Sequence, residues 1–229
     1  MRNTLPVPTT LPSGARDGRD MRWEAHRARR RRQLVEAALR AIRKHGPGVG
    51  MDEIAAEAAT SKTVLYRHLG DRTGLYRAVV AAVDETILAD LTVARASNGD
   101  VVSRIEAMVR SYLALVERDP AIYRFVVTRP LETHDGDPAD PVHQITDRIA
   151  HQLTTTVHEH LTATGRGVDA DRLAPVWGHG IVGLVRSASE HWLGQDSTDP
   201  ASPPVLSADD VTAAVVDLIR PALRGARQT

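Results

Sequence analysis

Hydrophobic and polar positions repeat with a helical period from about residue 24 to the end of the chain, and runs that alternate at period two are almost absent. The pattern therefore predicts an all-α protein. In the segment QLVEAALRAIRKHG, residues 33–46, apolar side chains fall on one helical face and charged side chains on the other. The first helix is predicted to end at Gly46, because the Gly-Pro-Gly sequence at 46–48 does not allow it to continue.

Two short helices are predicted next, at Met51–Ala58 and at about Lys62–Leu69. The turn between them has about three residues, and this length is typical of a helix-turn-helix. The second helix would then be the recognition helix, with Val64 and Leu65 packed inward.

The predicted recognition helix carries side chains suited to DNA. Its N-terminal residues are placed to reach base edges, and basic or hydroxylated residues near both ends are placed to contact phosphates. The run RARRRR, residues 27–32, is either a solvated helix face or, beside a recognition helix, a phosphate-contacting arm. We expect the DNA contacts to be Arg29, Arg30, Ser61, Lys62, Thr63, Tyr66, Arg67, His68 and Arg72.

Six further helices are predicted in the rest of the chain. Two segments rich in proline, glycine and aspartate, starting at Arg129 and at Gly194, are predicted loops. The expected organisation is a disordered tail at 1–21, a DNA-binding domain at 22–80 and a larger helical domain at 81–229. The predicted helices span Gly74–Arg95, Asp100–Asp119, Pro120–Thr128, Pro141–Thr164, Asp169–Gly194 and Ser207–Arg224.

The amino-acid composition indicates a globular protein and argues against several other classes. The chain has 229 residues, 42% of them hydrophobic, which is enough for a buried core. It has no cysteine, so disulfides, thiolate metal sites and a cysteine nucleophile are excluded, and a reducing cytoplasm is the expected compartment. Neither a signal-peptide core nor a run of about 18 apolar residues is present, which argues against secretion and against a membrane span.

The formal net charge of zero conceals two halves of opposite charge. Residues 1–80 have 16 Lys and Arg against 8 Asp and Glu, whereas residues 81–229 have 13 against 21. The balances are thus +8 and −8. Chance segregation is one explanation, but the basic part coincides with the predicted helix-turn-helix, so a polyanion is the better-supported partner.

The segment GVGMDEIAAEAATSKTVLYRHLGDRTGLYRAVVAAV, residues 48–83, closely resembles the DNA-binding signature of the TetR (tetracycline repressor) family of bacterial transcriptional regulators. It departs at Ala59, where glycine is frequent, and at Leu69, where phenylalanine is usual; neither departure removes a DNA contact. The resemblance implies an N-terminal three-helix bundle with a helix-turn-helix. It also implies a larger C-terminal domain that binds a ligand and forms a homodimer.

The resemblance further implies that part of the apolar stripe at Val101–Val116 lines an effector pocket, although the stripe alone indicates core. Aliphatic walls favour a small hydrophobic effector. The segments IYRF from Ile122 and GIVGLVRSASEHWL from Gly180 are also similar, more weakly, to a subgroup with fatty-acid-metabolism regulators that respond to acyl-CoA. The pocket candidates are Met108, Tyr112, Tyr123, Leu153, Val157 and Trp177.

Small residues in the Asp169–Gly194 helix recur at spacings of three or four and share a face. With the last helix they suit a four-helix interface between two copies, and packing within one chain is the alternative. The family favours the dimer, which DNA reading by paired half-sites requires. The candidate interface residues are Gly180, Gly183, Ser187, His191, Val211, Val215 and Leu218.

Two patterns that suggest other chemistry are rejected. GHGIVG, residues 178–183, matches the dinucleotide-binding glycine pattern but has no preceding strand. His143, Asp147, His151 and His158 share one side of a helix, but that side has the composition of a solvated face, so no metal and no cofactor is expected. No nucleophile elbow, phosphate-binding loop or zinc-protease motif is present, and an enzyme is not predicted.

The sequence is therefore interpreted as a regulator that binds a palindromic double-stranded DNA operator as a homodimer, most simply a repressor released by its effector. The helix Gly74–Arg95 would couple the two domains, because it begins beside the DNA and enters the ligand domain. One alternative is a helical binding protein or enzyme whose basic N-terminal region meets another anionic partner. A nonspecific DNA-compacting protein is a further alternative.

Overall fold

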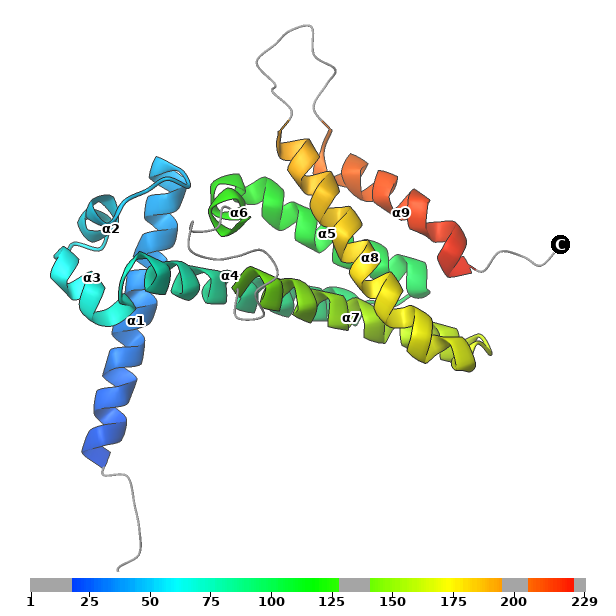
Figure 1. Ribbon diagram of the computed structural model, residues 1–229, viewed down its shortest axis with the longest axis horizontal. Coiled ribbons are helices and arrows are strands. Elements are labelled where there is room, and N and C mark those ends of the chain that lie inside the picture. Colours follow the sequence, from blue (N-terminus) through cyan, green and yellow to red (C-terminus); the bar gives the residue numbers. More distant parts are fainter. Residues whose placement is uncertain (1–17, 128–140, 195–205, 225–229) are drawn as a thin grey trace, which may run out of the picture.

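The computed structural model describes residues 18–127, 141–194 and 206–224 (Figure 1). Within these ranges the backbone forms nine helices and no strand, which confirms the all-α prediction. The helices are α1 (Gly18–His45), α2 (Met51–Glu57), α3 (Lys62–Leu69), α4 (Arg72–Arg95), α5 (Val101–Arg118), α6 (Pro120–Val127), α7 (Pro141–Ala163), α8 (Gly167–Leu193) and α9 (Ala208–Arg224).

The predicted helices agree with these bounds to within a few residues, except at the start of the chain. Helix α1 begins at Gly18, inside the range 1–21 that was expected to be a tail, and residues 1–17 lie outside the described residues. Most of the two predicted loops also lies outside them.

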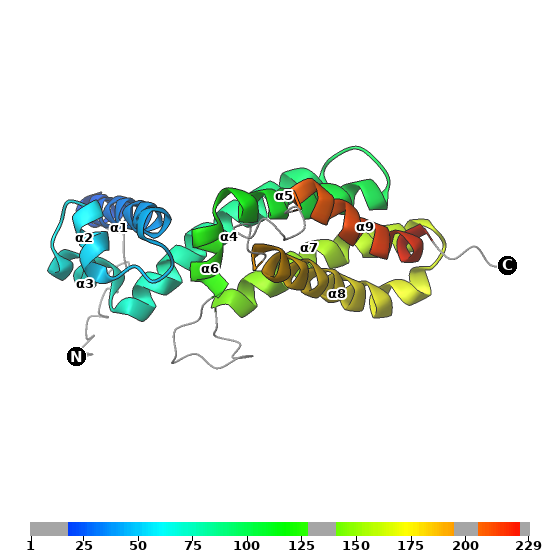
Figure 2. The ribbon, with the colours of Figure 1, turned by 90° about the horizontal axis from the view of Figure 1, so that it is seen from above.

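The N-terminal bundle consists of α1, α2, α3 and the first turns of α4, which lie together at one end of the molecule (Figures 1 and 2). The apolar face predicted for α1 is buried there. Side-chain caps begin α3 and α4: the Ser61 hydroxyl accepts from the Val64 amide at 3.4 Å, and the Asp71 carboxylate accepts from the Gly74 amide at 2.8 Å. The bundle core includes Leu34, Ile42, Ile54, Leu65, Leu69 and Val79.

The C-terminal domain is formed by α4, α5, α7, α8 and α9, with the short α6 between it and the N-terminal bundle (Figure 2). Helices α7 and α8 form the most extensive contact. Gly178 of α8 makes it possible, because a Cβ there would lie 2.4 Å from Thr154 Oγ1 and 2.8 Å from the Ala150 carbonyl oxygen of α7. The buried Asp84 of α4 pairs with Arg148 of α7; burial raises the pKa of Asp84, and the guanidinium opposes this.

Ala59, in the turn of the helix-turn-helix, has φ +46°, the left-handed region that favours glycine. This is one of the two positions where the sequence departs from the TetR pattern. The other, Leu69, is 3% exposed and fills its place in the bundle core.

We predict that Ala59→Gly stabilises the protein. The left-handed conformation costs alanine about 1–2 kcal/mol, and the added freedom of glycine in the unfolded chain offsets part of the gain, which leaves roughly 0.5–1 kcal/mol. Urea denaturation followed by circular dichroism measures the change. The control is Ala81→Gly on the exposed side of α4, which is expected to destabilise by about 1 kcal/mol. Equal losses in both variants would contradict the prediction.

Candidate DNA-binding surface and ligand cavity

The recognition helix α3 buries one face and exposes the other. Leu65 and Leu69 are fully buried in the bundle, whereas Tyr66 is 49% exposed. Helical spacing puts Lys62, Thr63 and Arg67 on the exposed side with the tyrosine, and all three are exposed. The structure therefore presents the predicted base-reading side chains together on one surface. Ser61 is also exposed, but its hydroxyl caps the helix.

In the structure, which contains no DNA, Lys62 forms an ion pair with Asp52. Its Nζ lies 2.6 Å from Asp52 Oδ1 of α2. The pKa of Lys62 is raised, first by its hydrogen bond to Asp52. Both side chains are exposed, so the pair orients the lysine at little cost and can exchange Asp52 for a DNA phosphate or base.

Arginines of α1 surround the C-terminal end of α3. Arg31 Nη1 donates to the His68 carbonyl oxygen at 2.6 Å, and thus caps the recognition helix. The pKa of His68 is lowered by partial burial, then by the nearby Arg67, Arg30, Arg27 and His26. The structure thus places the positively charged Arg30 and Arg67 around His68.

The other two arginines of the predicted set lie differently. Arg72 is exposed at the start of α4, next to the Asp71 cap and close in sequence to α3. Arg29 is also exposed, but the helical spacing to Leu34 and Ala38 turns it away from the bundle core and from α3. Arg27 and Arg31, which belong to the same run but were left out of the predicted contacts, lie on the side that faces α3.

Two interactions join the N-terminal bundle to the rest of the chain. Arg43 of α1 donates to both carboxylate oxygens of Asp119, with Nε–Oδ1 2.7 Å and Nη2–Oδ2 3.2 Å. The pKa of Asp119 is lowered, first by this hydrogen bond. Nearby, the buried Tyr76 hydroxyl of α4 donates to the Val126 carbonyl oxygen at 2.8 Å, and its ring lies 5.8 Å from that of Phe125. Both links end at α6 or at its first turn.

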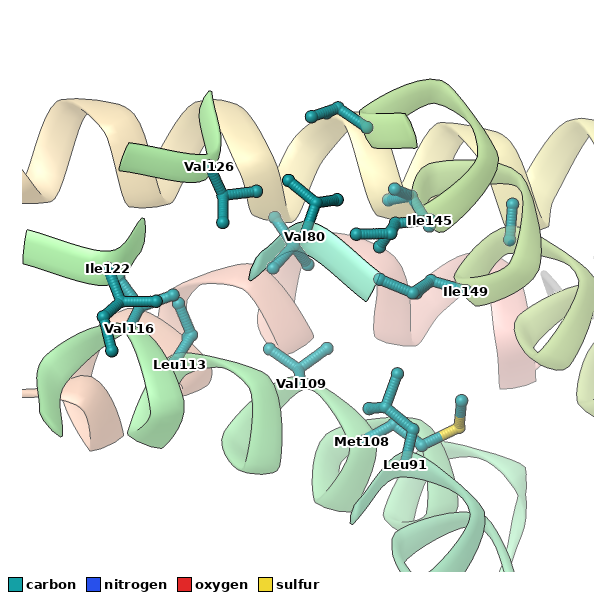
Figure 3. Packing of buried hydrophobic residues seen from close by; sticks show 14 of the residues in the cluster. Val80, Leu91, Met108, Val109, Leu113, Val116, Ile122, Val126, Ile145 and Ile149 are labelled. Atoms are coloured by element: carbon teal, nitrogen blue, oxygen red, sulfur yellow. The ribbon is translucent and has the colours of Figure 1, made fainter. Parts of the chain in front are cut away.

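The C-terminal domain encloses a cavity of about 170 Å³. Side chains from α4, α5, α6 and α7 turn toward one another around it, with Ile122 and Val126 of α6 at one end and Ile145 and Ile149 of α7 opposite α5 (Figure 3). Its walls are mainly aliphatic. They include Leu39, Val83, Ile87, Leu91, Met108, Val109, Tyr112, Val116, Ile122, Tyr123, Val126, Ile145, Ile149, Leu153 and Val185.

The charged and phenolic groups of the cavity wall come from α1, α5, α6 and α8, whereas Thr86 of α4 and Thr146 of α7 add hydroxyl groups. Arg43 and Asp119 are among the wall residues, as are Arg118 and Arg186. Tyr112 and Tyr123 join them; burial raises the pKa of both phenols, so both hydroxyls are neutral donors at physiological pH. Among the described residues, Tyr123 Oη is buried and makes no hydrogen bond of good geometry. A ligand with a polar group would satisfy it.

Four of the six predicted effector residues line this cavity: Met108, Tyr112, Tyr123 and Leu153. Val157 and Trp177 do not. Val157 has no exposed surface and belongs to the core, one turn beyond Leu153. Trp177 lies at the other end of the domain, where Arg166 stacks over its ring at 5.9 Å. Periodicity marked all six as apolar helix positions but could not separate core from cavity.

Five of the seven residues predicted for the dimer interface are exposed at the surface, and two are buried. Gly180, Gly183, Ser187 and His191 form an exposed face of α8, and Leu218 of α9 is 71% exposed. Val211 and Val215 are 5% and 3% exposed and pack inside the chain, so they offer little surface to a second copy. The amphipathic pattern of α9 located its apolar face correctly, but that face covers the chain's own core.

The histidine-rich side of α7 makes acid contacts without forming a metal centre. His143 Nε2 lies 3.4 Å from Asp147, and His158 Nε2 lies 3.0 Å from Asp171. Across the described ranges, no group of three His, Cys, Asp or Glu side chains is placed to hold a metal ion. Within the same ranges, no helix is both long and apolar enough to span a membrane.

A helix-turn-helix joined to a helical domain with an apolar cavity defines a DNA-binding transcriptional regulator. Comparison with protein families agrees: residues 34–79 match the model described as bacterial regulatory proteins, tetR family. Residues 90–208 match the tetracyclin repressor-like, C-terminal domain. The chain belongs to the TetR family of transcriptional regulators, which are DNA-binding proteins and not enzymes.

Individual relatives agree with this assignment. An uncharacterized HTH-type transcriptional regulator of Mycobacterium tuberculosis is 33% identical over 196 residues, 85% of this chain and 77% of the relative. The HTH-type transcriptional activator FasR of Mycolicibacterium smegmatis is 28% identical over 171 residues, 74% of this chain and 75% of FasR.

Solved structures share the fold at low sequence identity. FadR of Bacillus subtilis in complex with stearoyl-CoA has a TM-score of 0.63 at 14% identity, over 82% of this chain and 96% of that chain. A TetR-family regulator of Pectobacterium atrosepticum has a TM-score of 0.65 at 20% identity, over 88% and 95%. At these identities the likeness shows the fold alone.

We predict that DNA binding is linked to proton uptake at His68. Nearby arginines help to lower the pKa of His68, and DNA phosphates would offset them and raise it. A group whose pKa rises on binding strengthens binding at low pH, so affinity should fall several-fold from pH 6 to pH 8. Fluorescence anisotropy with labelled duplex DNA measures this. His68→Gln should reduce the dependence of DNA affinity on pH, and the control His45→Gln should keep it. If His68→Gln keeps the pH dependence of the wild type, His68 is not the group that takes up the proton.

Proposed function

We propose that this protein is a ligand-responsive repressor that binds a palindromic operator as a homodimer and releases it when a small hydrophobic effector enters the C-terminal domain. The supporting observation is that one ion pair, Arg43–Asp119, connects the DNA-binding bundle to the wall of an apolar cavity. On this proposal residues 22–80 bind DNA and residues 81–229 bind the effector and the second copy. The DNA partner would place the protein in the cytoplasm.

The exposed side of α3 reads the operator. Lys62, Thr63 and Tyr66 lie toward its N-terminal half, which enters the major groove in helix-turn-helix proteins. Arg67 and Arg72 contact the phosphates on either side and fix the register. Arg30 adds a third phosphate contact from α1 and His68 a proton-dependent one. Arg29, which faces away from α3, contributes only through the general positive field.

The effector has a long apolar part and one polar end. Aliphatic side chains of α4, α5 and α7 surround most of the cavity, whereas its wall also includes two tyrosines and three arginines, of which Arg186 is close enough to both tyrosines to affect their pKa. FadR, which shares the fold, was solved with stearoyl-CoA, a molecule of this shape. We therefore place acyl-type molecules first among the effectors to be tested. The relative FasR is named as an activator, so each assay should also register tighter DNA binding on addition of ligand.

Coupling follows from what the effector touches. Leu39 and Arg43 of α1 share the cavity wall with Asp119, Ile122 and Val126 at α6. A ligand that displaces α6, or competes for Arg43, changes the angle between the bundle and the domain. In a dimer the two recognition helices must lie about 34 Å apart, so a change in angle removes contacts at both half-sites together.

The exposed face of α8 at Gly180, Gly183 and Ser187, together with Leu218 of α9, forms the dimer contact in this proposal. No Cβ clash surrounds Gly180 or Gly183 within the chain, so their small size leaves room for a helix of a second copy. Two helices from each copy would pack as a four-helix bundle.

The decisive experiment removes the base-reading side chains. Lys62→Ala with Tyr66→Ala should abolish preference for the operator, since each good base contact contributes about 1–3 kcal/mol of discrimination. Duplexes selected from a random library by the wild-type protein serve as operator, and anisotropy against a scrambled duplex measures the preference. The control Lys44→Ala, at the far end of α1, should behave as wild type. A double variant that still discriminates contradicts this reading of α3. A wild type that never discriminates favours the nonspecific or non-DNA alternatives.

We predict that Asp119→Asn weakens the effector response more than it weakens DNA binding itself. Couplings of this kind are typically about 1–3 kcal/mol, so a 5–150-fold change in operator affinity on addition of stearoyl-CoA should shrink toward unity. The matched control is Glu57→Gln. Glu57 also pairs with an α1 arginine, Arg40, at 3.0 Å, but within the N-terminal bundle. Loss of the response in both variants would indicate general destabilisation instead of interdomain coupling.

A further inference from the structure

The N-terminal part of α1 extends beyond the bundle that the rest of the helix helps to form (Figure 1). From Met21 onward, the first buried residue of α1 is Leu34, and residues 21–29 are all exposed. We call residues 21–30 the α1 extension. At about 1.5 Å per residue it is about 15 Å long, and one strand of DNA offers a phosphate about every 3.4 Å of helix axis.

The extension has the composition of a polyanion-binding helix. Residues 21–32 contain six arginines and a histidine but one acidic residue, Glu24. Arg27 is three and four positions from Arg30 and Arg31, so these like charges are neighbours on the helix surface and repel one another. An anionic partner along this edge would remove the repulsion and stabilise the helix.

An exposed aromatic side chain lies on the same edge. Trp23 is 65% exposed. Its spacing of four from Arg27 and seven from Arg30 puts the three side chains in one stripe, which continues along the helix to the buried Leu34. The stripe is therefore on the side of α1 that faces the bundle, not on its far side.

The stripe continues the charged surface of the recognition helix. Arg31, one residue beyond the extension, donates to the His68 carbonyl oxygen at the end of α3. Arg27, Arg30 and His26 are close enough to His68 to lower its pKa. A polyanion in contact with α3 and Arg67 thus meets the extension next.

We propose that the α1 extension is a second DNA-contacting element, which lies along the sugar-phosphate backbone outside the base pairs that α3 reads. Arg27 and Arg30 each neutralise a phosphate, and Trp23 packs against the adjoining sugars. The extension therefore adds affinity and lengthens the protected DNA without adding sequence preference. This inference rests on the proposed function, because it takes α3 as the reading helix.

The test compares salt dependence in paired variants. Arg27→Ala with Arg30→Ala should lower the slope of log Kd against log salt by about 2, since each lost phosphate contact removes about 0.9. At about 0.15 M salt this corresponds to a loss on the order of 30-fold, the same for selected and for scrambled duplexes. The control, Arg172→Ala with Arg224→Ala, removes equal charge from exposed sites on α8 and α9 and should leave the slope unchanged.

Duplex length supplies a second measurement. The Arg27→Ala/Arg30→Ala variant should lose less affinity on selected duplexes trimmed to the palindrome, where only the Arg30 contact is at stake, than on flanked duplexes. Equal losses on both lengths would contradict a contact outside the palindrome. Trp23→Ala should weaken binding to flanked duplexes several-fold with little change in slope.

An unchanged slope and affinity in the arginine double variant overturns the proposal even if the wild type discriminates its operator well. Conversely, a wild type that shows no sequence preference but loses two units of slope in this variant would overturn the proposed function and leave the extension as a DNA contact. Circular dichroism of each variant confirms that the fold is kept.

Discussion

The bidentate ion pair between Arg43 and Asp119 joins the DNA-binding bundle to the C-terminal domain at the wall of the cavity. A planar guanidinium that donates to both oxygens of a carboxylate fixes orientation as well as distance. With the buried hydrogen bond from Tyr76 to Val126, it sets the angle at which α3 is presented. The position of the reading surface therefore depends on contacts made at α6, which lies between the bundle and the C-terminal domain.

Local information in the sequence was sufficient for most of the fold. The period of apolar positions located the helices, and the short turn after Met51–Ala58 identified the helix-turn-helix with its exposed Lys62, Thr63 and Tyr66. These predictions succeed because each depends on neighbours within one or two helical turns. The start of α1 was placed too late, since arginine-rich turns carry no apolar stripe from which a boundary can be recognised.

Contacts between segments distant in the sequence could not be predicted from the pattern of apolar and polar positions. Arg43 and Asp119 are 76 positions apart, and no periodicity relates them. Val211 and Val215 show the same limit: an apolar helix face indicates burial, but not whether the chain itself or a second copy covers it. Val157 and Trp177 were apolar positions of the right kind that three-dimensional packing placed away from the cavity.

Gly178 has a mechanical consequence. Because α8 lies against α7 with no side chain between the backbones at this point, neither helix can move toward the other, and their long contact makes that side of the domain stiff. The opposite side is α6, eight residues held by a ring contact, the hydrogen bond from Tyr76, a hydrogen bond from Arg124 to the Leu193 carbonyl oxygen of α8, and the adjoining ion pair. The α7–α8 side of the cavity is thus more rigid than the side formed by α6. A displacement of α6 would act on the bundle through Tyr76 and Arg43, and on the end of α8 through Arg124.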